Sequence, residues 1–168
     1  GSSVTIMPDK RTIVGYTTKN SGGVPANFKN YFVLRFDHDF SFVGSIEDGK
    51  LSEGKTSATS NHAMAVVGFR TKRGEQVNIQ VASSFISDEQ AQRNLKEVEG
   101  KTFDEVKSEG RKEWNNILGR IEVEDDNIDH LRTFYSCLYR SVLFPRSFYE
   151  FDEQGNPIHY SPYNGKVL

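Results

Sequence analysis

Hydrophobic and polar positions alternate along the first half of the chain with the two-residue period of a β-strand. In residues 76–84, Val77, Ile79 and Val81 are separated by polar residues, which is typical of a strand with one face in water. Residues 31–36 are apolar on both faces, which indicates a strand lying between two layers. The predicted strands are Ser3–Met7, Arg11–Thr18, Asn30–His38, Phe40–Ile46, His62–Thr71 and Gln76–Ser84.

Short turn sequences separate these segments. They are Asn20-Ser21-Gly22-Gly23, Asp48-Gly49, Glu53-Gly54 and Arg73-Gly74. Short strands with turns at this spacing predict an antiparallel β-sandwich.

After Ser87 the hydrophobic period becomes helical. Ser87–Gln90 and Thr102–Glu105 match the capping box that begins many helices. An amphipathic helix is predicted over Thr102–Val123, and an apolar stripe from Ile128 to Val142 predicts another that ends before Pro145. Residues 148–160 predict a hairpin that turns at Gln154-Gly155-Asn156. Strands first and helices second favour an α+β chain with two units and a boundary within residues 86–126.

Composition excludes several classes of protein. The formal net charge is −2, so the chain lacks the basic surface expected of a nucleic-acid-binding protein. No apolar run is long enough to span a membrane. Cys137 is the single cysteine, so no internal disulfide forms, and its aromatic neighbours favour a small buried side chain.

Two groups of carboxylates could supply chemistry. Asp37 and Asp39 would share one face if the strand continued through them, and a metal ion or an acid–base pair could use them. Glu150 and Asp152, with Glu153 beside them, could form the paired carboxylates of a glycosidase. Both groups lie near predicted turns, however, where charged side chains are more often solvated.

The segment from Tyr160 to Asn164 is the third candidate. Its aromatic rings could cover the C–H faces of a sugar while the Asn164 amide bonds hydroxyl groups. We therefore predict substrate-binding roles for Tyr160, Tyr163 and Asn164. A plain structural loop is the alternative interpretation of the same residues.

Taken together, the chain resembles the bacterial calcium-dependent α-mannosidases of glycoside hydrolase family 92. The resemblance extends from about residue 10 to the end, with its parts in order. They are Asn30–Asp37, Ala65–Phe69, Val81–Ser87, Glu89–Leu95, Trp114–Ile121, Thr133–Tyr135, Leu138–Arg140, Phe144–Arg146 and Tyr160–Val167.

The resemblance implies three regions. Residues 1–86 would be an incomplete β-sandwich, residues 87–125 a helical linker, and residues 126–168 the start of an (α/α)6 catalytic barrel. It also implies an exo-acting, inverting α-mannosidase of the α-1,2 type that removes terminal mannose from N-glycans or mannan. Calcium would be the cofactor of the whole enzyme, which would work outside the cytoplasm, in the periplasm, at the cell surface or after secretion.

In that family the catalytic carboxylates and the calcium site lie later in the barrel. We therefore expect this chain to be an inactive piece of a larger enzyme, with no catalytic residue, no metal ligand and no bound calcium of its own. Its partners would be mannose-containing glycans, and apolar surface uncovered by truncation would allow self-association. The competing interpretation is a non-catalytic carbohydrate-binding or structural β-sandwich module.

Overall fold

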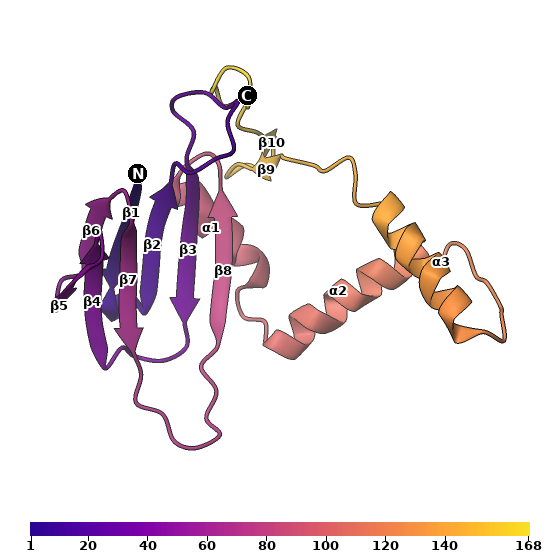
Figure 1. Cartoon of the computed structure of the whole chain (residues 1–168), viewed down its shortest axis with the longest axis horizontal. Helices are drawn as coiled ribbons and strands as arrows, with labels where there is room; N and C mark the ends of the chain where they lie inside the picture. Colours follow the sequence, from indigo (N-terminus) through magenta and orange to yellow (C-terminus); the bar gives the residue numbers. More distant parts are fainter. The chain divides into compact units, whose positions relative to one another are not determined.

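The computed structural model describes all residues from Gly1 to Leu168, and the chain folds as two compact units (Figure 1). The first unit combines Gly1–Glu99 with Tyr149–Leu168, and the second is Gly100–Phe148. Antiparallel strands make up most of the first unit and two helices form the second, so the predicted α+β class is confirmed. No helix is both long enough and apolar enough to cross a membrane.

The first unit contains two antiparallel sheets. The larger has the strand order β6-β1-β2-β3-β8 and the smaller has the order β5-β4-β7. The strands are β1 Ser2–Met7, β2 Thr12–Thr17, β3 Asn30–Phe36, β4 Phe42–Glu47, β5 Lys50–Glu53, β6 Ser57–Ser60, β7 Ala63–Gly68 and β8 Ile79–Ser84. All six strands expected from the sequence are present, whereas β5 and β6 were not anticipated.

The two sheets pack face to face around one apolar core. Ile6, Ile13 and Phe36 are its buried members, and they come from β1, β2 and β3. Side chains of the smaller sheet, Val43 and Val67 among them, pack against these residues. The two layers therefore form the predicted β-sandwich.

A helix covers the opposite face of the larger sheet. Helix α1 spans Asp88–Asn94 and continues into the 3-10 turn η2, Leu95–Val98. Val33 of β3 is fully buried against Ala91 and Leu95. Since Phe32 and Leu34 on the other face of β3 contact the sandwich core, the predicted position of this strand between two layers is confirmed.

The expected capping boxes differ in the structure. At Thr102 the box is complete, because the hydroxyl accepts from the Glu105 N–H and the Glu105 carboxylate accepts from the Thr102 N–H. At Ser87 only half of it forms: the hydroxyl accepts from the Gln90 N–H at 3.1 Å. The buried Gln90 side chain instead donates to the Phe151 carbonyl and so joins α1 to the C-terminal segment.

The second unit consists of α2, Phe103–Leu118, and α3, Ile128–Ser141. Trp114 packs against Tyr139 with ring centroids 4.6 Å apart, and the Tyr135 hydroxyl donates to the Ile121 carbonyl. Neither helix has a fully buried residue. Cys137 is exposed, so its expected burial is wrong.

Beyond α3, the chain returns to the first unit and ends in two hairpins. Strands β9, Glu150–Phe151, and β10, Pro157–Ile158, form the first, which confirms the expected hairpin in residues 148–160. The second spans residues 159–168 and contains the third candidate group of the sequence.

Candidate functional site

The terminal hairpin, residues 159–168, is held by main-chain hydrogen bonds. His159 and Leu168 exchange two of them, at 2.9 and 3.0 Å. The Ser161 N–H donates to the Lys166 carbonyl at 2.8 Å, and Gly165 adopts a left-handed conformation with φ of 71° at the turn. Residues 162–164 therefore project from a closed turn rather than from a loose loop.

Tyr160 lies at the base of this hairpin and is buried, with 9% of its surface exposed. Its hydroxyl donates to Oδ1 of Asn27 at 3.1 Å, since an amide oxygen only accepts. Its ring meets Phe28 edge to face, with centroids 6.2 Å apart. Tyr160 thus anchors the hairpin to the loop between β2 and β3.

Tyr163 and Asn164 stand at the tip and are both exposed. Tyr163 has 94% of its surface exposed, and its side chain makes no hydrogen bond. Oδ1 of Asn164 accepts from the Lys166 N–H at 3.0 Å, which leaves its amide N–H groups directed to solvent. An exposed aromatic ring and an exposed amide on neighbouring residues are the kinds of group that bind a sugar ring.

The structure thus separates the three predicted binding residues into an anchor, Tyr160, and two accessible side chains, Tyr163 and Asn164. Sequence reasoning missed Asn27, which also donates from Nδ2 to the Gly165 carbonyl at 2.9 Å. No local pattern marks this residue, because its partners lie 133 and 138 residues further along the chain.

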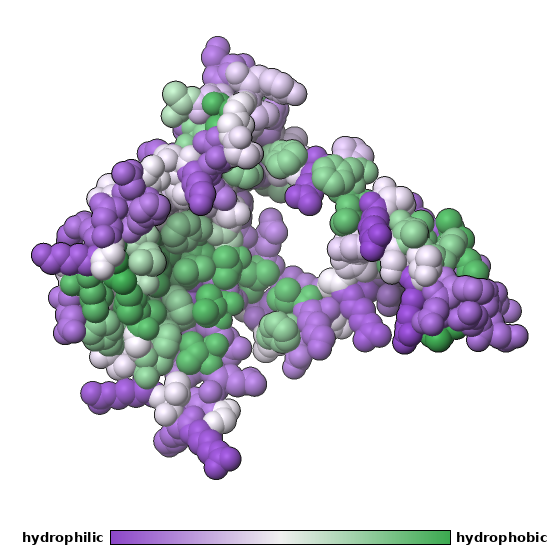
Figure 2. All heavy atoms as spheres, in the orientation of Figure 1, coloured by the Kyte–Doolittle hydropathy of each residue, from purple (hydrophilic) through white to green (hydrophobic).

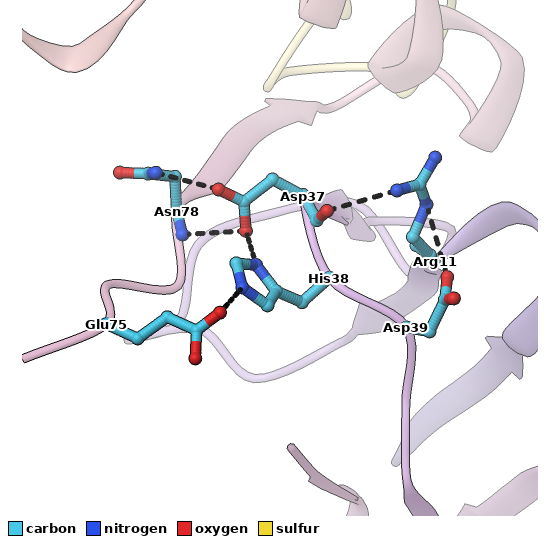
Figure 3. A network of polar contacts seen from close by, with 6 residues as sticks. All are labelled: Arg11, Asp37, His38, Asp39, Glu75 and Asn78. Atoms are coloured by element: carbon cyan, nitrogen blue, oxygen red, sulfur yellow. Dashed lines mark hydrogen bonds and ion pairs between the residues drawn. The ribbon is translucent and has the colours of Figure 1, made fainter. Parts of the chain in front are cut away.

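Asp37 and Asp39 do not form a pair on one strand face, because β3 ends at Phe36. Asp37 accepts hydrogen bonds from His38 and from the main chain and side chain of Asn78 (Figure 3). Asp39 instead lies 3.8 Å from the Arg11 guanidinium. The two carboxylates therefore bind different partners and do not form a shared acid–base or metal site.

His38 connects this group to the loop before β8. Its Nδ1 bonds Asp37, and its Nε2 lies 3.3 Å from Oε1 of Glu75 (Figure 3). Both carboxylates stabilise the protonated ring and raise the pKa of His38 above its usual value. Desolvation acts to raise the pKa of Asp37, but hydrogen bonds from His38 and Asn78 outweigh it and lower the pKa.

The carboxylates of the β9–β10 hairpin serve different structural purposes. Glu150 accepts from the Phe85 N–H at 3.1 Å and from Nδ2 of Asn94 at 2.7 Å, so it ties β9 to β8 and α1. Asp152 accepts hydrogen bonds from the side-chain amide of Asn156 and from the main-chain N–H groups of Asn156 and Gln154. These bonds, that of the Asn156 side chain first, lower the pKa of Asp152. Both carboxylates are therefore engaged in hydrogen bonds that hold the hairpin and its neighbours.

An open cleft of about 640 Å³ lies over the outer surface of α1. Its lining is almost wholly charged: Arg35, Glu89, Gln92, Arg93, Lys96, Glu99, Asp152 and Glu153. Two ion pairs neutralise much of this charge, Arg35 with Glu99 at 2.9 Å and Arg93 with Glu153 at 2.6 Å. The cleft has none of the hydrophobic and aromatic side chains that usually line a small-molecule site.

Comparison with known proteins places the chain among glycoside hydrolases. The family model described as "Glycosyl hydrolase family 92 N-terminal domain" matches residues 1–84, and "Glycosyl hydrolase family 92 catalytic domain" matches residues 90–168. The chain belongs to glycoside hydrolase family 92, so the resemblance seen in the sequence is confirmed.

Solved structures of this family share the fold. A family 92 inverting mannosidase from Bacteroides thetaiotaomicron VPI-5482 is 47% identical, with a TM-score of 0.95 over 99% of this chain and 23% of that chain. A second α-mannosidase of the same species is 27% identical, with a TM-score of 0.75 over 93% of this chain and 22% of that one. This chain therefore spans less than a quarter of the length of either solved relative.

Among curated proteins, a secreted glycosidase of Arthroderma benhamiae, described as uncharacterized, is 32% identical over 78 residues. The match covers 44% of this chain and 10% of that protein.

Proposed function

We propose that this chain is part of an exo-acting, inverting α-mannosidase that removes terminal mannose from N-glycans or mannan. The principal support is the 47% identity to an inverting mannosidase over 99% of this chain. In our proposal the enzyme prefers α-1,2 links and works outside the cytoplasm. The description of the fungal relative as secreted supports that location.

Inverting hydrolysis uses one carboxylic acid to protonate the leaving oxygen and one carboxylate to activate water on the opposite face. The two stand roughly 6.5–9.5 Å apart to admit that water. Asp37 and Glu150, two of the candidate carboxylates from the sequence, already accept hydrogen bonds from main-chain N–H groups. We therefore assign neither catalytic role here and propose that both belong to other parts of the enzyme.

Calcium is proposed for the whole enzyme only. No three His, Cys, Asp or Glu side chains of residues 1–168 are arranged to hold a cation. We therefore propose no calcium-binding role for these residues and derive no step from the ion. We further propose that residues 1–86 form the later part of a sandwich, residues 87–125 a linker, and residues 126–168 the beginning of an (α/α)6 barrel.

Within this chain we propose the terminal hairpin as the part that approaches the sugar. Tyr163 would lie against the C–H face of a mannose ring, Asn164 would donate to a hydroxyl, and Tyr160 would support both from below. The support is their exposure and the free donors of Asn164.

The activity is tested by comparing the whole protein with residues 1–168. With calcium present, the whole protein should release mannose from α-1,2-mannobiose with inversion, which proton NMR detects as initial formation of the β-anomer. The chain alone should release none. A whole protein that binds mannobiose without cleaving it would instead establish the alternative, a non-catalytic carbohydrate-binding module.

We also propose that the isolated chain self-associates through an uncovered part of the sandwich. Val81 and Ile79 pair with Leu34 and Phe36, so they share the face that packs on the smaller sheet. That sheet has three strands against five, and Val81 and Ile79 remain 60% and 50% exposed. Figure 2 shows apolar atoms gathered over the region of β7, β3 and β8.

Sedimentation velocity over a range of concentrations tests this association. Val81→Lys should shift the distribution toward monomer, because a charge on this face resists burial. Ser108→Lys, at an exposed position of α2, is the matched control and should have no effect. A chain that stays monomeric at every concentration would contradict the proposal.

A further inference from the structure

Asn27 joins two parts of the chain that separate family models match. It lies in the loop between β2 and β3, within residues 1–84, whereas its partners lie in the terminal hairpin, within residues 90–168. Its Nδ2 donates to the Gly165 carbonyl at 2.9 Å, and its Oδ1 accepts from the Tyr160 hydroxyl at 3.1 Å. One amide thus holds the first strand of the hairpin and its turn.

A side chain at Gly165 would displace the Asn27 amide from its present position. A Cβ atom added there would lie 2.2 Å from Oδ1 of Asn27, so the amide occupies the space where a side chain would be. The φ of +71° independently favours glycine. The hairpin therefore turns at the point where it meets Asn27.

Aromatic packing supports the same contact. Phe28, the next residue, lies between Tyr160 at 6.2 Å and Phe85 at 5.7 Å between ring centroids. Phe85 follows β8 directly, so this stack connects the base of the hairpin to the larger sheet. The loop before β3 therefore holds the hairpin through one polar contact, at Asn27, and one apolar contact, at Phe28.

The position of the hairpin tip, Tyr163 and Asn164, depends on these contacts of Asn27 and Phe28. The Tyr163 side chain is 94% exposed and has no contact of its own that orients it. Its direction is therefore set by the backbone of the turn, which is held by the Ser161–Lys166 bond and by Asn27.

We propose that Asn27 is a positioning residue for saccharide binding: it fixes the hairpin so that Tyr163 and Asn164 present one aromatic face and one pair of amide donors to a pyranose. This inference rests on the proposed function of the hairpin. Asn27 itself does not touch the sugar, since both ends of its amide are already bonded within the protein.

The test uses the full chain, isotopically labelled for NMR, with Asn27→Leu as the main variant. Leucine is close in size but loses both hydrogen bonds. Asn27→Asp keeps the acceptor for Tyr160 and loses the donor to Gly165. Asn61→Leu is the matched control, because Asn61 is exposed and its recorded hydrogen bond uses the main-chain oxygen. A dispersed spectrum establishes that each variant folds.

The first measurement is hydrogen exchange of the Ser161, Gly165 and Leu168 amides, which donate within the hairpin. Asn27→Leu should raise their exchange rates by on the order of tenfold, with a smaller rise in Asn27→Asp and none in the control. Unchanged exchange in Asn27→Leu would overturn the inference.

The second measurement is a titration with α-1,2-mannobiose, followed at the Tyr163 and Asn164 amides. Binding in Asn27→Leu should weaken severalfold, with partial recovery in Asn27→Asp. Equal affinity in Asn27→Leu and the unmodified chain would reduce Asn27 to a structural contact and overturn the inference. If the unmodified chain shows no sugar-dependent shift, the hairpin site fails, and the exchange data separate that failure from loss of the Asn27 contact.

Discussion

Replacing Leu95 with alanine tests the packing of α1 and η2 on the larger sheet. Leu95 is fully buried, and it packs with Val33 and Ala91, which are also fully buried. The side chain lies between a helix and a sheet that are both fixed by other contacts, so the space it leaves cannot close easily. The variant should therefore retain a cavity in addition to losing apolar burial.

The expected cost is about 3 kcal/mol in the free energy of unfolding, since fully buried Leu→Ala substitutions cost roughly 2–5 kcal/mol. For a unit of this size the loss corresponds to a fall of roughly 10 °C in Tm. Leu95→Met, which nearly conserves volume, should cost less than about 1.5 kcal/mol.

Urea unfolding followed by far-UV circular dichroism measures these differences, and the m-value should stay constant across the series. Lys96→Ala is the matched control, because Lys96 is the exposed neighbour of Leu95 and should change stability by no more than about 0.5 kcal/mol. A cost below about 1 kcal/mol for Leu95→Ala would refute the packing of the helix on this face.

Three further outcomes are expected. Gln90→Ala should lower the free energy of unfolding by about 1–3 kcal/mol in urea titrations, because it leaves buried hydrogen-bond partners unsatisfied. Ser87→Ala should cost about 1 kcal/mol in the same assay through loss of the N-cap of α1. The raised pKa of His38 implies that its contribution to the free energy of unfolding is complete below the ordinary histidine pKa of about 6.5 and is lost as pH rises through the folded pKa. Unfolding measured against pH should show this decline, and His38→Gln should remove it.

The sequence predicted the strands that have their own apolar pattern and missed those that do not. β5 reads Lys-Leu-Ser-Glu and β6 reads Ser-Ala-Thr-Ser, and neither alternates strongly. They are strands because β4 and β1 offer pairing edges beside them. Tertiary pairing of this kind overrides weak local preference.

In the candidate site, too, the sequence predicted one part correctly and missed another. Tyr160 and Tyr163 are the same residue type within one short polar segment, yet one is buried and the other is almost fully exposed. The difference arises from Asn27 and Phe28, which are distant in sequence, so composition correctly indicated an unusual loop but could not assign its parts. Asp37 and Asp39 do not share a strand face because β3 ends at Phe36. The ends of strands are poorly defined by alternation alone, so the sequence could not show this.

Because β3 has apolar side chains in both layers, the contrast between a wet face and a dry face is weaker for it than for an ordinary surface strand. In a half-exposed strand, a shift of one residue would expose the buried set, and solvation would oppose it. Here a shift would instead place the rings of Phe32 and Phe36 toward α1 and the smaller Val33 toward the second sheet. The same shift would turn Arg35, which pairs with Glu99 in the open cleft, toward the sandwich core. Side-chain volume and the cost of burying that charge therefore both keep this strand in alignment, and substitutions that exchange large and small residues along it should be poorly tolerated.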